Sequence, residues 1–336
     1  MLLLGGSNDI FFTGSDLCAR NNMAAMVHQL LAAGCRVYVG LPLPIGISFY
    51  TFQLISYVVD VYRGSIHAQP RFTRLLLYSS LFHQCIAGPI VRYKTIDEEL
   101  FGRRRRKPEW SAGVTRFTAG LAKKVLLANT CGIVTEKITA AGLSVAGSWL
   151  LAVSYAFQIY FDFSGYSDMA IGMGLMVGFH YRENFMYPYA ADSVTDFWRR
   201  WHITLSSFFR EYVYISLGGN RKGKLITYRN LLITWALTGL WHGFSLNFLL
   251  WGLYFALILI IEKAFLGKLI ASAPRLLQRS YSLLLIAIGW VIFASDGSLI
   301  GIDEGGAYIL RLFGIGCSEL CASLTLYELW RNAAFI

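Results

Sequence analysis

Long uncharged runs alternate with short charged segments along most of this chain. A helix needs about 20 apolar residues to cross a hydrocarbon core. The uncharged runs that reach this length cover residues 37–59, 138–161 and 230–261. The last run is long enough for two short helices, and Gly239 and Gly243 predict a break between them. Shorter or more polar runs, of which we expect some to be re-entrant, cover 75–91, 125–135, 169–181 and 281–295.

The composition identifies a membrane protein and excludes an ordinary soluble domain. Hydrophobic residues make up 55% of the 336 residues, charged residues 15%, and the mean hydropathy is +0.49. The net charge of +10 comes mainly from short segments between apolar runs. This distribution favours contact with membrane lipid and argues against nucleic acid. We therefore expect an all-α polytopic helical bundle, with segment 101–110 (FGRRRRKPEW) cytoplasmic and the acidic segment 295–306 facing outward.

The first 42 residues form a different kind of unit. A short apolar strand leads to the turn GGSNDI, an amphipathic helix ends at Gly34, and the strand CRVYVGLPLP follows, which predicts a βαβ-like fragment. Without a basic start and a continuous apolar stretch, the segment is not expected to be a signal peptide. The turn resembles the asparagine block of the GDSL or SGNH hydrolases, in which the asparagine, here Asn8, donates to an oxyanion. The nucleophile and Asp-x-x-His blocks are missing from the fragment, so we expect 1–42 to be non-functional and 43–336 to form the membrane domain.

A charged stretch at residues 195–220, TDFWRRWHITLSSFFREYVYISLGGN, interrupts the apolar sequence. Four apolar residues in it share one helical face: Phe197, Trp201, Leu205 and Phe208. This spacing predicts one amphipathic helix at the membrane interface. Arg199, Arg200 and Arg210 would then be free to bind lipid headgroups or the phosphates of a nucleotide-like cofactor.

His242 stands alone in the run at 230–261, which contains no Asp, Glu, Lys or Arg and no other histidine. An imidazole in apolar surroundings tends to stay neutral near pH 7, and a neutral imidazole can take a proton from a hydroxyl. The flanking glycines would let backbone or substrate approach closely, which would permit a lined tunnel. The alternative is a hydrogen-bonded core histidine. A second polar cluster interrupts another apolar run and consists of Gln158, Asp162, Ser164, Ser167 and Asp168.

The six cysteines indicate neither a metal site nor a disulfide framework. They form no CxxC pair, and no histidine lies at metal-ligand spacing from any of them. We therefore expect no metal and treat the cysteines as small apolar residues. A disulfide between Cys317 and Cys321 is the alternative.

Several ordered motifs resemble the membrane-bound O-acyltransferase family, most closely its bacterial alginate O-acetylase branch. They are LPIGISFYTFQLISYVVDVYRG at 43–64, AGPIVRY at 87–93, YFDFSGYSDMAIG at 160–172, ENFMYPY at 183–189, FWRRWHITLSSFFREYVYISLGGN at 197–220 and GLWHG at 239–243. The resemblance extends over residues 43–314. The signature histidine of the family falls on His242, and its second polar position falls on His202 in Arg-Trp-His-Ile.

The resemblance implies a bundle of about ten or more spans with re-entrant segments, in the bacterial inner membrane, around a tunnel where cytoplasmic acetyl-CoA meets its acceptor. His242 would be the general base, and His202 would orient the acceptor, stabilise the oxyanion or share the base role. The charges of Arg199, Arg200 and Arg210 suggest that they hold the CoA phosphates. The implied acceptor is an exported polysaccharide such as alginate, with an SGNH-like extracytoplasmic acetyltransferase as a further partner.

Two departures from the family pattern concern the ends of the chain. Family members have further spans before the segment at 43–64 and further helices after GWVIF at 289–293, so we expect a membrane domain truncated at both ends. Two alternatives to acetyl transfer stay open. One is D-alanyl transfer to teichoic acid within the same family, and the other is an inactive or transport-like membrane scaffold, in which His242 and Asp162 would line a path.

Overall fold

The computed structural model describes residues 46–85, 88–102, 107–140, 144–295, 300–301, 304–317 and 319–332. The regular elements within these residues are helices, so the all-α expectation is confirmed for them. The βαβ-like fragment at 1–42, with Asn8, lies outside the described residues, as do four residues of the basic segment, 103–106. The division into two domains therefore stays a prediction.

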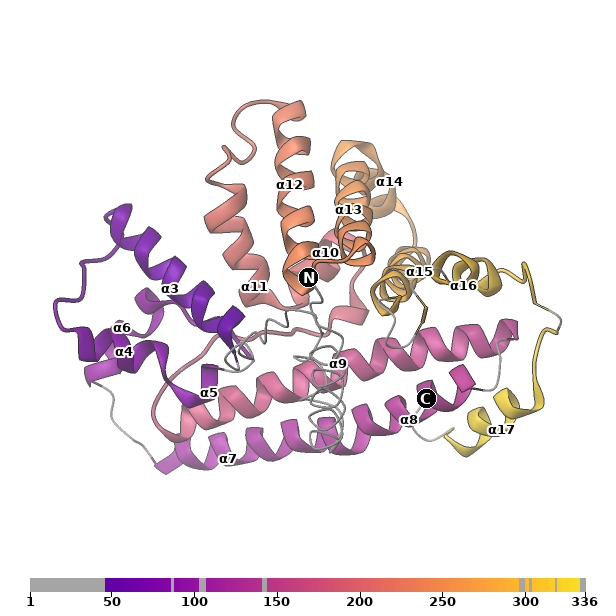
Figure 1. Cartoon of the computed structure of the whole chain (residues 1–336), viewed down its shortest axis with the longest axis horizontal. Coiled ribbons are helices and arrows are strands. Elements are labelled where there is room, and N and C mark those ends of the chain that lie inside the picture. Colours follow the sequence, from indigo (N-terminus) through magenta and orange to yellow (C-terminus); the bar gives the residue numbers. More distant parts are fainter. Residues whose placement is uncertain are drawn as a thin grey trace, which may run out of the picture.

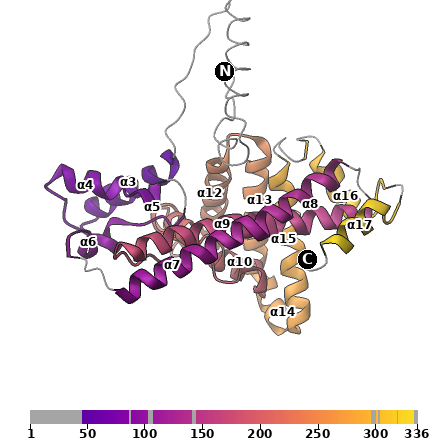
Figure 2. The same cartoon turned by 90° about the horizontal axis from the view of Figure 1, so that it is seen from below.

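A long rod of helix extends along one side of the molecule. It consists of α7 (Lys107–Ala122), a π-helical segment (Lys123–Ala128) and α8 (Asn129–Ala140). The rod packs antiparallel against the 32-residue helix α9 (Val145–Met176) (Figure 1). Seen from below, it crosses the molecule from the end near α6 to the end near α16 (Figure 2). Several of the other helices pack against this helix pair.

Facing glycines allow the rod and α9 to pack backbone against backbone. A Cβ atom at Gly120 would lie 2.5 Å from the carbonyl oxygen of Gly165, and one at Gly113 would lie 2.6 Å from that of Gly172. Small residues permit this kind of close approach between helices in membranes, where dispersion contacts replace the hydrophobic effect. The polar cluster that the sequence places on α9 also serves this interface. Asp168 pairs with Lys123 at 2.6 Å, and Asp162 pairs with Lys124.

Four short helices form one end of the molecule: α3 (Ile47–Tyr62), α4 (Phe72–Ser79), α5 (Phe82–Cys85) and α6 (Tyr93–Gly102). Their buried aromatic side chains pack with Phe179 beyond α9. The described part of the apolar run at 75–91 contains the end of α4 and all of α5, and neither helix has the length of a span. A charged network joins this end to the centre. Arg92 pairs with Glu211, and Tyr212 donates to Asp60 at 2.8 Å.

A helical hairpin stands on the other side of α9. It consists of α12 (Lys224–His242) and α13 (Leu246–Ile261), so the break predicted in the run at 230–261 is confirmed at residues 243–245. A π-helical turn (Glu262–Leu266) and α14 (Gly267–Ser272) continue α13, and α15 (Arg275–Ala294) follows. Within the described residues, the helices long and apolar enough to span a membrane are Leu246–Ser272 and Arg275–Ala294.

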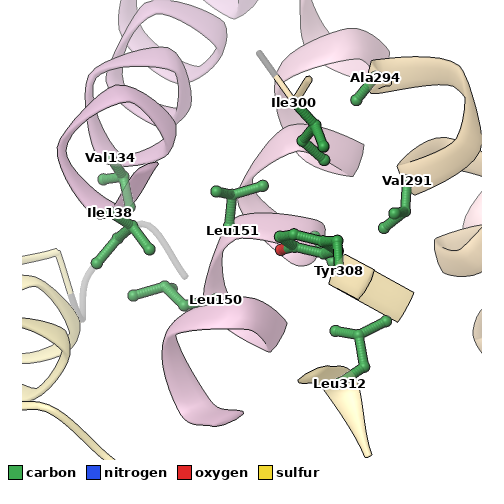
Figure 3. Packing of buried hydrophobic residues seen from close by; sticks show 10 residues of the cluster. Val134, Ile138, Leu150, Leu151, Val291, Ala294, Ile300, Tyr308 and Leu312 are labelled. Atoms are coloured by element: carbon green, nitrogen blue, oxygen red, sulfur yellow. The ribbon is translucent and has the colours of Figure 1, made fainter. Parts of the chain in front are cut away.

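The far end of the molecule has its own apolar core, in which α15 and α16 (Gly305–Leu312) pack on α8 and α9 (Figure 3). Tyr308 lies at its centre and donates a hydrogen bond to the carbonyl oxygen of Ser148. The last helix, α17 (Ser323–Arg331), lies beside this core. The expected span at 138–161 is wrong, because Ser144 caps the start of α9 by accepting from the N–H of Gly147 at 3.1 Å. The run therefore divides between the end of α8 and the first half of α9.

Candidate active site

A cavity of about 920 Å³ opens in the centre of the molecule. Its wall is formed by α9 to α15, including the two short helices α10 (Val194–Arg200) and α11 (Ile203–Phe208). The cavity brings together four of the five residues singled out in the sequence: His202, His242, Arg199 and Arg210. Arg200 is not part of the lining and pairs with Asp196 at 2.9 Å, one helical turn earlier.

His242 is the last residue of α12 and forms part of the apolar wall of the cavity. Its ring stands edge-on to Trp251, at 5.2 Å between centroids, and to Phe293, at 5.0 Å. These rings make the surroundings of the imidazole apolar on two sides. The position therefore agrees with the expectation of a histidine in apolar surroundings.

The glycines beside His242 are places where another helix approaches closely. A Cβ atom at Gly239 would lie 2.2 Å from the carbonyl oxygen of Phe248, and one at Gly243 would lie 2.7 Å from the Phe248 ring. The space beside both glycines is thus filled by α13, so of the two expected roles the structure has close approach of protein and not room for substrate. They instead allow α12 and α13 to pack closely, which places His242 at the turn of the hairpin.

His202 lies at a sharp break in the chain. The predicted single helix over this stretch is wrong, because Trp201 is extended and His202 has φ of 42°, in the left-handed region. The break separates α10 from α11, and a neighbouring segment stabilises it from both sides. The Ile203 N–H donates to the Asn184 carbonyl at 2.9 Å, and the Met186 N–H donates to the Arg200 carbonyl at 2.9 Å. The four apolar residues of the predicted face are nevertheless buried: Phe197, Trp201, Leu205 and Phe208.

The ring of His202 is only 4% exposed and has different surroundings on its two nitrogens. Nδ1 lies 3.1 Å from Asn184 Oδ1. Nε2 is buried and has no hydrogen-bond partner among the described residues. Trp241 contacts both histidines, with ring centroids 6.4 Å from His202 and 4.7 Å from His242. The two imidazoles thus share one wall of the cavity.

Basic side chains lie where the cavity opens. Arg199 and Arg210 are exposed, line the cavity and form no ion pair with another described residue. Lys263 is also in the lining, and its ammonium group donates to Asn220 at 2.9 Å. Two carboxylates also line the cavity: Glu262, which is buried and accepts from Val194 N, and Asp192, which pairs with Arg279 at 3.4 Å. Arg199 and Arg210, without ion-pair partners among the described residues, are therefore the lining side chains best suited to a phosphorylated ligand.

Three groups of the site were not found by sequence reasoning: Asn184, Glu262 and Trp241. Asn184 lies in one of the family-like motifs, but nothing in the local pattern connects it with His202, 18 residues away. Glu262 contacts α10 across 68 residues of sequence. Such contacts have no local periodicity by which to recognise them.

Other sequence expectations fall outside the cavity. Asp162, which the transport-like alternative needs in the path, is not in the lining and pairs with Lys124. Cys317 and Cys321 are not joined by a disulfide, so the alternative of a disulfide between them is wrong. Among the described residues, no group of three or more His, Cys, Asp or Glu side chains is arranged to hold a metal ion.

Comparison with known proteins identifies relatives of this site. The model of the membrane-bound O-acyltransferase family matches residues 65–294, which include both histidines. A probable alginate O-acetylase of Pseudomonas syringae pv. tomato is 46% identical over 255 residues, which are 76% of this chain and 49% of the relative. The peptidoglycan O-acetyltransferase of Helicobacter pylori is 37% identical over 314 residues, 83% of this chain and 58% of the relative.

A more distant relative transfers a different group. The teichoic acid D-alanyltransferase of Bacillus subtilis is 29% identical over 237 residues, which are 66% of this chain and 59% of the relative. The chain thus spans about half the length of the curated relatives that it matches. The family match and the alginate O-acetylase relatives agree with the helical fold. The chain belongs to the membrane-bound O-acyltransferase family.

Proposed function

We propose that this protein transfers an acetyl group from acetyl-CoA to hydroxyl groups of an exported cell-envelope polysaccharide. The observation that carries the proposal is the meeting of His202 and His242 in one cavity whose opening bears two arginines without carboxylate partners among the described residues. Identities of 46% and 37% to O-acetylating relatives, against 29% to a D-alanyl transferase, favour acetyl over D-alanyl as the transferred group.

In the proposed reaction, His242 acts as the general base. Its imidazole takes the proton of the acceptor hydroxyl while the oxygen attacks the thioester carbonyl carbon. The carbon–sulfur bond then breaks, and the CoA thiolate leaves and takes up that proton as a thiol. The aromatic rings around His242 support this role because apolar surroundings favour a neutral imidazole, which can accept a proton. His202 lines the same cavity.

The basic residues at the opening are assigned to the donor. We propose that Arg199 and Arg210 bind the phosphates of acetyl-CoA, since guanidinium groups pair well with phosphate oxygens. Arg200 is left out of this assignment because it lies outside the cavity lining and pairs with Asp196. The apolar wall formed by Trp198, Trp235 and neighbouring rings suits the acetyl end of the donor.

The proposal also includes the location and partners of the protein. We place it in a bacterial inner membrane as a multi-pass protein, in line with the two apolar helices of spanning length among the described residues. Acetyl-CoA is cytoplasmic whereas the polysaccharide is exported, so the acetyl group must cross the membrane. An SGNH-like extracytoplasmic acetyltransferase that completes the transfer is the partner that this route suggests.

A labelled acetyl-CoA assay tests the function. Membranes containing the chain are incubated with acetyl-labelled CoA and either alginate or peptidoglycan glycan, beside His242→Gln and, as a matched control, His67→Gln. His67 is exposed and lies outside the cavity. We expect label in the glycan with the parent and the control, and loss of label with His242→Gln at equal expression. Transfer that survives in His242→Gln would refute the base assignment, and labelling from a D-alanyl carrier thioester instead would favour the alternative donor.

A further inference from the structure

The hydrogen bonds around Asn184 determine which of its side-chain atoms is the oxygen. The atom nearest His202 also lies 3.3 Å from the backbone N–H of Thr204. A backbone N–H can only donate, so its partner must be the amide oxygen, Oδ1. The amide nitrogen, Nδ2, donates on the other side to Ser167 Oγ at 3.0 Å. The orientation of Asn184 is therefore set by donors that do not depend on the protonation of His202.

The hydroxyl of Thr204 gives a second, independent constraint. Its Oγ1 accepts from the backbone N–H of Ile90 at 2.9 Å, so its own proton is free to be donated elsewhere. That proton points to Asn184 Oδ1, 2.9 Å away. Asn184, Thr204, Ser167 and His202 are each buried to 7% exposure or less. Within this network Asn184 Oδ1 acts only as an acceptor.

An acceptor opposite Nδ1 determines the tautomer of His202. Nδ1 lies 3.1 Å from Asn184 Oδ1, so a hydrogen bond between them requires the proton on Nδ1. In the neutral ring Nε2 then carries a lone pair. Nε2 is buried and without a partner among the described residues, in a side chain that lines the cavity. A buried lone pair without a donor is costly unless a ligand supplies the donor.

We propose that Asn184 is a positioning residue that holds His202 in the Nδ1–H tautomer, so that Nε2 accepts a hydrogen bond from the hydroxyl of the acceptor sugar. The proposal rests on the acyl-transfer function proposed above and deepens it. Of the three roles open to His202, it supports orienting the acceptor hydroxyl or sharing the base. It excludes the third role, in which neutral His202 stabilises the oxyanion, because that role needs a proton on Nε2.

A spectroscopic measurement tests the tautomer of His202 and does not require the protein to be active. The purified full chain is labelled with ¹⁵N-histidine, reconstituted in lipid and studied by solid-state NMR, and the His202 resonances are those lost in His202→Gln. Asn184→Asp keeps an acceptor at the same place and shifts the same resonances, which gives a second identification. We expect a proton on Nδ1 and a bare Nε2. A proton on Nε2 with a bare Nδ1 would overturn the proposal.

Kinetics test whether the tautomer matters for the reaction. Asn184→Ala removes the acceptor and should lower kcat for acetyl transfer about 10- to 100-fold, with little change in the KM for acetyl-CoA. Asn184→Asp should restore most of kcat. The matched control is Ser167→Ala, which removes the other hydrogen bond of the same amide and should leave kcat near that of the parent.

The two sets of results separate this proposal from the function on which it rests. A parent that transfers no acetyl group would refute the proposed function, while the NMR result would still decide the tautomer. Parental kcat in Asn184→Ala would refute the positioning role. An equal loss in Ser167→Ala would also refute it, because the amide would then act through packing and not through the His202 hydrogen bond.

Discussion

Gly252 is a position where a single methyl group should damage the site. It lies on α13 and faces α12, where a Cβ atom would be 2.3 Å from the carbonyl oxygen of Trp235 and 3.1 Å from its carbonyl carbon. The next nearest atom is the Cα of Gly239, at 3.4 Å. All three are backbone atoms, so no side chain can rotate out of the way. Gly252→Ala must therefore push α12 and α13 apart.

The size of the effect follows from these distances. Ordinary contact begins at 3.4 Å, so the two helices must separate locally by about 1 Å. Overpacking of this kind costs about 1 to 3 kcal/mol of stability. Trp235 and His242 both lie on α12, and His242 is its last residue, about two turns beyond Trp235. A shift of about 1 Å at a reacting group can lower a rate about 100-fold.

Two assays on purified protein in detergent check this expectation. Thermal unfolding measures the stability loss, and transfer from labelled acetyl-CoA measures the rate. Gly306→Ala in α16 is the matched control, because no atom lies within 4 Å of its added Cβ. We expect the control to melt at or slightly above the parental temperature, since alanine favours helix. A Gly252→Ala protein with parental melting temperature would refute the packing argument, whatever the activity of the chain.

Three further predictions concern charged side chains. Glu262→Gln should lower the free energy of unfolding by about 1 to 3 kcal/mol. Each carboxylate oxygen of Glu262 accepts from one N–H group at the start of α10, whereas the amide of glutamine has only one oxygen that can accept. An unchanged thermal midpoint would contradict this. Burial of Glu211 opposes its ionisation, but the hydrogen bond and charge of its arginine partner hold the pKa of the carboxyl below its usual 4.5. The contribution of ionised Glu211 to stability is therefore present above pH 4.5 and is lost at lower pH. The difference in thermal midpoint between the parent and Glu211→Gln should shrink as the pH falls. A difference that grows as the pH falls would refute this expectation. Arg199→Gln and Arg210→Gln should raise the KM for acetyl-CoA with a smaller effect on kcat, whereas Arg200→Gln should leave that KM unchanged; equal effects of all three would refute the phosphate assignment.

The sequence alone was sufficient for the features that depend on local pattern. Hydropathy predicted a helical membrane protein, and the length of the run at 230–261 predicted the break that the structure has at 243–245. The spacing of apolar residues from Phe197 to Phe208 predicted which side chains are buried. Hydropathy, length and periodicity act through neighbouring residues, so they can be read without knowing the fold. The family motifs also pointed to His202 and His242, which the cavity brings together.

The same local reasoning failed where a distant segment overrides it. Periodicity predicted one helix through His202, but the segment at 184–186 pairs with the backbone on both sides and stabilises a left-handed residue there. Hydropathy predicted a span at 138–161, but a single serine cap divides it between two helices. The glycines near His242 were expected to let backbone or substrate approach, and only the fold shows that α13 fills that space.

The sequence by itself therefore determined the class of protein, the break in its longest apolar run and two histidines that line its central cavity. Only the tertiary structure decided how these histidines are held. Asn184, the acceptor opposite His202 Nδ1, is 18 residues away in sequence. Glu262, whose carboxylate accepts from the start of α10, lies 68 residues after Val194. Ile90, which donates to Thr204 in the network around Asn184, is 114 residues from Thr204. Hydrogen-bond partners at such separations have no periodic signal in the chain, because they are set by how helices cross and not by the pattern along any one of them.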